Sequence, residues 1–149
     1  MRIGIPTETS PGETRVAATP ETVKKLTSGG RHVVTVQSGA GVRASIPDEA
    51  FTAAGATVVP SAAEATGAVD IVLKVRRPSP SEIDALRPGT IVVGLLVPHE
   101  ADGLAALAAR GLTAFALERV PRITRAQAMD VLSSQANIAG YKAVLLAAN

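Results

Sequence analysis

The residues best suited to chemistry lie in the stretch PRITRAQAMDVLSSQANIAGYKAV, residues 121–144 of a 149-residue chain. Its beginning combines four different polar groups: the guanidinium of Arg122, the amide of Gln127, the carboxylate of Asp130 and the hydroxyl of Ser133. Such a set supplies both hydrogen-bond donors and acceptors, so it could hold a neutral polar ring that bears an amide. The expected helix face around it carries almost no Lys or Glu, and we predict that another group, not water, covers it.

Two plainer interpretations of the same stretch stay open. Thr124 and Gln127 fit the capping-box pattern S/T-x-x-E/Q, so Gln127 could simply close the start of a helix. Arg122 and Asp130 could pair with each other. Residue types alone do not decide between these interpretations and a binding site.

Three further candidates each have a simpler alternative role. Arg15 could anchor a carboxylate with its two-pronged guanidinium, or it could pair with Glu8 or Glu13. His99 could act as a general base, or it could be a solvated residue at a helix start. GAGVRA, residues 39–44, matches the dinucleotide fingerprint G-x-G-x-x-G/A, but the helix signal begins only at Pro47, so we predict a turn without phosphate binding.

These candidates must be positioned by alternating strands and helices. Apolar runs predict strands at 2–6, 32–37, 57–59, 69–75, 90–96 and 112–117, with helices at 19–30, 47–55, 60–67, 80–87 and 99–110 between them. Strands that read as continuous apolar runs are typical of a parallel sheet buried on both faces. We therefore predict a three-layer α/β sandwich with a mostly parallel sheet, flavodoxin- or Rossmann-like, without its own dinucleotide fingerprint.

The last element differs from the others in length. From Thr124 to Asn149 there is no Pro and a single Gly, and apolar residues recur every three or four positions. This pattern predicts one long helix, about 39 Å from end to end. We divide the chain into an α/β domain, 1–123, and a helix, 124–149, that leads to a further domain.

Composition excludes several classes of protein. The net charge is +2 and aromatic residues make up 2%, so nucleic-acid binding is not expected. The chain has no Cys and two His, which excludes disulfides and thiolate sites and does not favour a metal site. The N-terminus lacks a signal-peptide pattern, and no apolar run could cross a membrane, so we expect a cytoplasmic protein.

Several stretches resemble a known family over essentially the whole chain. PRITRAQAMDVLSSQANIAGYKAV looks like the signature of the alpha subunit of proton-translocating NAD(P) transhydrogenase. MRIGIPTETSPGETRVAATPETV is similar to the N-terminal signature that this subunit shares with alanine dehydrogenase. DIVLKVRRP and LRPGTIVVGLLVP fit the same family.

The resemblance implies a fold, a reaction and a site. The transhydrogenase component has two α/β domains joined by long helices, and the second domain, absent here, carries the dinucleotide fingerprint. The nicotinamide ring of NAD(H) lies in the cleft between them. By motif match, the first domain would hold this ring through Arg122, Gln127, Asp130 and Ser133.

The resemblance also implies partners and a location. Hydride passes directly between NAD(H) and NADP(H), which is bound to a partner component, so the protein chiefly positions the cofactors. Membrane-embedded components couple the reaction to proton translocation. We expect a homodimer that is peripheral to the inner membrane through its partner subunits, without membrane insertion of its own, and an isolated chain that is inactive.

Two alternatives remain. Alanine dehydrogenase holds its substrate with an Arg, which matches Arg15, with a Lys that is Arg76 here, and with a His that falls close to Val97, two positions from His99. The chain could also be a non-catalytic domain that uses its long helix to dimerise or dock.

Overall fold

The computed structural model describes residues 1–148 and contains one six-stranded sheet. All strand pairs are parallel, and the strand order is β3-β2-β1-β4-β5-β6. The strands are β1 (Arg2–Ile5), β2 (Val33–Gln37), β3 (Thr57–Val59), β4 (Ile71–Arg76), β5 (Ile91–Leu95) and β6 (Thr113–Ala116). This doubly wound order confirms the predicted fold class, and all six expected strands are present.

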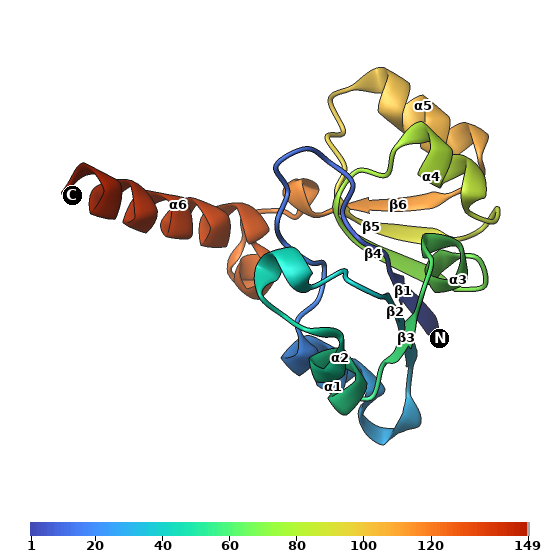
Figure 1. Cartoon of the computed structure of the whole chain (residues 1–149). Coiled ribbons are helices and arrows are strands. Elements are labelled where there is room, and N and C mark those ends of the chain that lie inside the picture. Colours follow the sequence, from blue (N-terminus) through green and yellow to red (C-terminus); the bar gives the residue numbers. More distant parts are fainter. Residues whose placement is uncertain (149) are drawn as a thin grey trace.

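Helices lie on both sides of the sheet (Figure 1). They are α1 (Pro20–Thr27), α2 (Asp48–Ala53), α3 (Ala62–Thr66), α4 (Pro80–Ala85), α5 (Ala101–Ala109) and α6 (Val131–Ala147). Short 3₁₀ segments lie at η1 (Ser28–Gly30), η2 (Val42–Ala44), η3 (Leu117–Arg119) and η4 (Thr124–Met129). Helices α1 and α2 pack on one face of β1–β3, and α3, α4 and α5 pack on the opposite face.

Cover on the α1–α2 side stops near β4. Ile3 and Val34 are opposite each other in neighbouring strands of that face and are 3% and 1% exposed. Farther along the same face, Leu73 is paired with Val93 and Val93 with Phe115, which is 57% exposed. Side chains opposite each other in a parallel sheet point to the same side, so this half of the face has no helix over it within residues 1–148.

The final helix differs from the one expected from the sequence. A continuous helix from Thr124 was predicted, but residues 124–129 form a 3₁₀ segment, and α6 begins only at Val131. The reason is Asp130, whose φ of −76° and ψ of 86° break the helix while its side chain accepts a hydrogen bond from the Ser133 N–H. The 17 residues of α6 are about 25 Å long. Asn149, the last residue of the predicted helix, lies outside the described residues.

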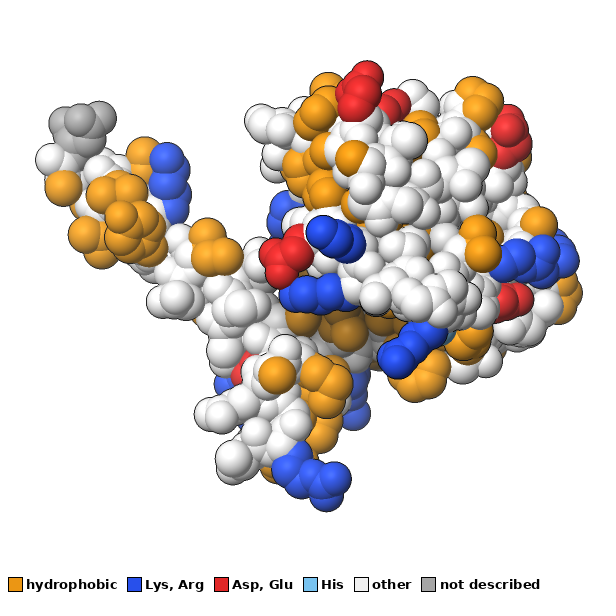
Figure 2. Space-filling view, turned by 90° about the horizontal axis from the view of Figure 1, so that it is seen from below, with side chains coloured by type: hydrophobic (Ala, Val, Ile, Leu, Met, Phe, Trp, Pro, Cys, Tyr) orange, Lys and Arg blue, Asp and Glu red, His pale blue; other side chains and the backbone are white. Residues whose placement is uncertain are grey.

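Helix α6 projects away from the sheet, and none of its residues is buried. Its apolar residues are exposed: Ile138 is 61% exposed, Tyr141 70% and Val144 67%. Figure 2 shows hydrophobic side chains gathered towards the end of this projecting helix. A helix with apolar residues on every side is usually covered by another element or chain.

Glycine at position 4 permits the close contact between α3 and β1. A Cβ built on Gly4 would clash with the backbone oxygen of Ala65, an atom that cannot move aside without displacing α3. We predict that Gly4→Ala lowers the free energy of unfolding by roughly 1–3 kcal/mol, because such overpacking forces a backbone shift. Urea denaturation followed by circular dichroism measures this change.

Gly140→Ala is the matched control. A Cβ at Gly140 meets nothing within 4 Å, and the residue lies inside α6. This substitution should leave the stability unchanged or raise it by up to about 1 kcal/mol, since Ala favours helices more than Gly does. Equal stability of the two variants would contradict the proposed packing role of Gly4.

Candidate functional site

Several loops meet at the carboxyl edge of the sheet, where ligands bind in doubly wound proteins. Since all strands are parallel, the segments after β1, β4, β5 and β6 leave the sheet at this edge. The strand order reverses between β1 and β4, which places the loops 6–19 and 77–79 on the two sides of the switch point. Both the polar N-terminal turn and the approach to α6 belong to this edge.

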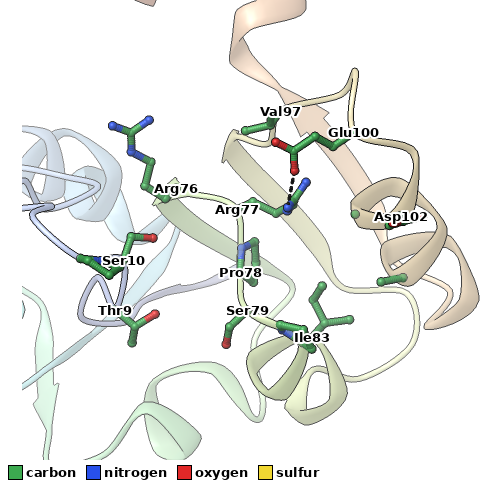
Figure 3. A pocket seen from close by; sticks show the side chains of 14 residues that line it. Thr9, Ser10, Arg76, Arg77, Pro78, Ser79, Ile83, Val97, Glu100 and Asp102 are labelled. Carbon is green, nitrogen blue, oxygen red and sulfur yellow. Dashed lines mark hydrogen bonds and ion pairs between the residues drawn. The ribbon is translucent and has the colours of Figure 1, made fainter.

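A cavity of about 510 Å³ opens between the loops after β1, β4 and β5. Figure 3 shows Thr9 and Ser10 on one side, Arg76 to Ser79 in the middle, and Val97 and Glu100 on the other. Arg77 binds the Glu100 carboxylate at 2.8 Å, so this cation is paired within the cavity. The residues predicted to hold a ring, Arg122, Gln127, Asp130 and Ser133, are not among those that line the cavity.

A buried carboxylate lies at the centre of this edge. Glu13, with a side chain 5% exposed, accepts hydrogen bonds from Arg15 Nε and Nη2, both at 2.6 Å, and from Arg76 Nε at 2.8 Å. The Arg15 backbone N–H donates to it as well, at 3.1 Å. The hydrogen bond from the Arg15 side chain is the main cause that lowers the pKa of Glu13 to about 2, and it outweighs the opposing effect of burial.

A second charged group lies beside it, around Lys74 in the middle of β4. The Lys74 ammonium is 2.6 Å from a carboxylate oxygen of Glu82 and 3.9 Å from one of Glu8, whose other contacts are the backbone N–H groups of Val75 and Arg76. Burial opposes ionisation of Glu82, but the hydrogen bonds from Lys74 and Ser79 prevail and lower its pKa. These pairs fix the N-terminal loop onto β4.

The four residues predicted to hold a ring do not share one helix face. Arg122 precedes the 3₁₀ segment η4, Gln127 lies within it, and both are exposed. Asp130 caps α6: its carboxylate accepts from Ser133 N at 3.0 Å and from Ser133 Oγ at 2.6 Å. The Ser133 hydroxyl, followed by its backbone N–H and by the charge of Arg122, lowers the pKa of Asp130 and keeps it ionised.

Neither plainer interpretation of this stretch matches the contacts. Among the hydrogen bonds of residues 1–148, none closes a capping box between Thr124 and Gln127, and η4 has no side-chain cap. Within the same described residues, Arg122 and Asp130 form no ion pair within 4 Å. Arg122 acts on Asp130 only through the longer-range attraction between their charges. Within residues 1–148, the side chains of Arg122 and Gln127 are exposed and form no hydrogen bond.

The other candidates lie as follows. Arg15 pairs with Glu13, one of the two carboxylates expected for the simpler role. GAGVRA forms a turn and the 3₁₀ segment η2, and α2 begins only at Asp48, so the segment does not open a helix, as predicted. His99 is exposed just before α5.

The structure adds residues that the sequence analysis did not single out. Glu82 pairs with Lys74, and the neutral amide of Gln135 accepts a hydrogen bond from Arg15. One signal was present: a Lys inside the apolar run DIVLKV requires a buried acid nearby.

Within residues 1–148, no group of three His, Asp or Glu could hold a metal ion, and no helix is long and apolar enough to cross a membrane.

Glu13 provides a test of this site by pH. Its pKa in the folded protein is lowered from 4.5 to about 2, so its contribution to stability is complete above pH 4.5 and is lost as the pH falls towards 2. We expect Glu13→Gln to lower the free energy of unfolding at pH 7 by about 3 kcal/mol and to abolish this part of the acid dependence. Urea titrations of both proteins between about pH 2.5 and 7 measure it; parallel curves would contradict the assignment.

Comparison with known proteins gives a consistent picture. Residues 4–139 match the model of the family described as alanine dehydrogenase/PNT, N-terminal domain. The chain is 48% identical to the first portion of the NAD(P) transhydrogenase alpha subunit of Rhodospirillum rubrum, over 97% of this chain and 39% of that protein. It is 40% identical to alanine dehydrogenase of Mycobacterium tuberculosis, over 99% of this chain and 39% of the relative.

A solved structure agrees with these relatives. The structure of transhydrogenase from Sinorhizobium meliloti superposes with a TM-score of 0.93 at 48% identity, over 99% of this chain and 44% of that one. The chain therefore spans about two fifths of the length of the proteins that it matches.

Proposed function

Since the chain belongs to the family of alanine dehydrogenase/PNT N-terminal domains, we propose that it is the first domain of the NAD(H)-binding component of a proton-translocating NAD(P) transhydrogenase. The observation that carries this proposal is the pairing of Arg15 and Arg76 with Glu13. An alanine dehydrogenase would need the Arg15 guanidinium for the carboxylate of its substrate, but here Nε and Nη2 bind Glu13 and Nη1 donates to Gln135. The four polar residues of the family motif, Arg122, Gln127, Asp130 and Ser133, lie before α6 and in its first turn.

The residues before α6 suit the amide of a nicotinamide ring. A carboxamide has one acceptor oxygen and two N–H donors. Arg122 can donate to the oxygen, and Gln127 can both donate and accept. Each oxygen of Asp130 accepts one hydrogen bond from Ser133, which leaves lone pairs for the N–H donors. Asp130 is ionised at neutral pH, and its pKa is lowered further by Ser133, so its carboxylate is an acceptor only.

In this proposal, the chain's residues orient the ring and do not take part in bond-making. The nicotinamide of NAD(H) supplies the hydride, which passes to NADP⁺ on a partner component. The four residues fix the plane of the ring through its amide. A second domain, after α6, holds the rest of the nucleotide and covers the polar side of the cleft.

Partners and location follow from the same proposal. The exposed apolar residues of α6, among them Ile138, Tyr141 and Val144, support contact with the following domain and with a second copy in a homodimer. The component would lie on the cytoplasmic side of the inner membrane, held there by the membrane-embedded subunits.

Asp130→Asn and Gln127→Asn in the complete component test the role of these residues. We expect each substitution to slow hydride transfer roughly ten-fold or more, since it removes a hydrogen bond to the ring, with assembly unchanged. Stopped-flow transfer between NADH and an NADP⁺ analogue gives the rate, and size-exclusion chromatography reports assembly. Asn137→Ala, an exposed polar position on α6, is the matched control. Intact transfer with lost assembly would instead support a docking domain.

Calorimetric titration of NADH into the 149-residue chain tests whether a second domain is needed. Because the four residues contact only the ring in this proposal, we expect no binding in the micromolar range. Micromolar affinity would reveal a nucleotide site within this chain and contradict the division of labour proposed here.

A further inference from the structure

One hydrogen bond ties α6 to the α/β domain. Among the side-chain hydrogen bonds of residues 1–148, only that from Arg15 Nη1 to Gln135 Oε1, at 2.9 Å, joins α6 to the sheet and its loops. The others made by α6 side chains stay within its first turn and its cap. Figure 1 shows the rest of the helix extending away from the domain. The direction of α6 therefore depends on few contacts, and this one is specific.

The partner of Gln135 is itself held rigidly. Two nitrogens of Arg15 bind Glu13, and Glu13 also accepts a hydrogen bond from Arg76 at the end of β4. The fork of a guanidinium is planar, so fixing Nε and Nη2 also fixes the direction of Nη1. Arg15 Nη1 thus presents a donor at a defined place relative to the sheet.

We propose that Arg15 and Gln135 are positioning residues that set the direction of α6 and, through it, the place of the Asp130–Ser133 cap. Gln135 lies just beyond Ser133, about half a turn along the helix. A change in the tilt of α6 would move the cap and the ring site with it. The effect on nucleotide binding rests on the function proposed above, whereas the effect on helix direction does not.

Spin-label distances test the helix direction without any ligand. The chain has no Cys, so Glu49→Cys on α2 and Lys142→Cys on α6, both exposed, give two unique labels. We expect a narrow distance distribution by pulsed electron resonance in the otherwise unchanged protein and a broad or shifted one with Gln135→Ala. Gln135→Glu should restore the narrow distribution, because a carboxylate also accepts from Arg15.

Asn137→Ala, two positions away on α6, is the control and should leave the distribution unchanged. Thermal unfolding should be the same for all of these variants, since Gln135 and Asn137 are exposed. A distribution for Gln135→Ala that superposes on that of the parent protein would overturn the proposal.

The second measurement uses the complete component and NADH. We expect Gln135→Ala to raise the KM for NADH about five-fold with little change in kcat, and Gln135→Glu to recover most of it. An altered distance distribution with an unchanged KM would overturn the link between α6 and the nucleotide site. The Asp130 and Gln127 variants distinguish this result from failure of the proposed function, because they remove contacts to the ring itself.

Discussion

The arrangement at the carboxyl edge depends on one buried carboxylate between two arginines. Glu13 lies 2.6 Å from Arg15 and 2.8 Å from Arg76, so it neutralises like charges that would otherwise repel each other next to β4. It also joins the N-terminal loop to the strand at the point where the strand order reverses. Glu8 and Lys74 form a similar ion pair deeper in the protein, where both side chains are 2% exposed. Without such pairing, burial of these charges would be strongly unfavourable.

The core, the loops and α6 are held by progressively fewer contacts. The sheet and its helices bury Ile5, Val36 and Phe51 completely and form a well-packed core. The ion pairs hold the loops onto this core. Helix α6 is held through one hydrogen bond and a few contacts near η3, and all of it is solvent-exposed or partly so. The polar residues before α6 therefore lie in the part of the described chain with few buried contacts, and local stability is lowest in such parts of a protein.

The strands of the sheet can be predicted from the sequence alone, but the residue at which the last helix begins cannot. Apolar runs such as IVLKV and IVVGLL are continuous and rich in β-branched residues, so their strand character is readable without knowing their neighbours, although β4 and β5 are fully buried only on alternate residues. For the helix, Thr124 and Gln127 matched a capping pattern, yet Asp130 with Ser133 forms the actual cap. Both capping patterns are equally plausible from the sequence, and the folded structure shows which one forms.

The sequence does not decide which acid pairs with Arg15, for a similar reason. Glu8 and Glu13 are both near it in sequence, and either could have been its partner. The rest of the network comes from far along the chain: Arg76 lies 63 residues from Glu13, and Gln135 lies 120 residues from Arg15. No local pattern reports contacts over such separations.

The uneven cover of the sheet has a consequence for handling this domain by itself. Phe115, Val93 and Leu73 lie side by side on the uncovered half of the sheet face and form an apolar patch next to β6, the edge strand of the sheet in residues 1–148. At high concentration, such molecules can associate, because the edge strand of one sheet can pair with that of another. The apolar patches then become buried in the contact. Concentrated solutions of the 149-residue chain would therefore contain aggregates as well as monomers.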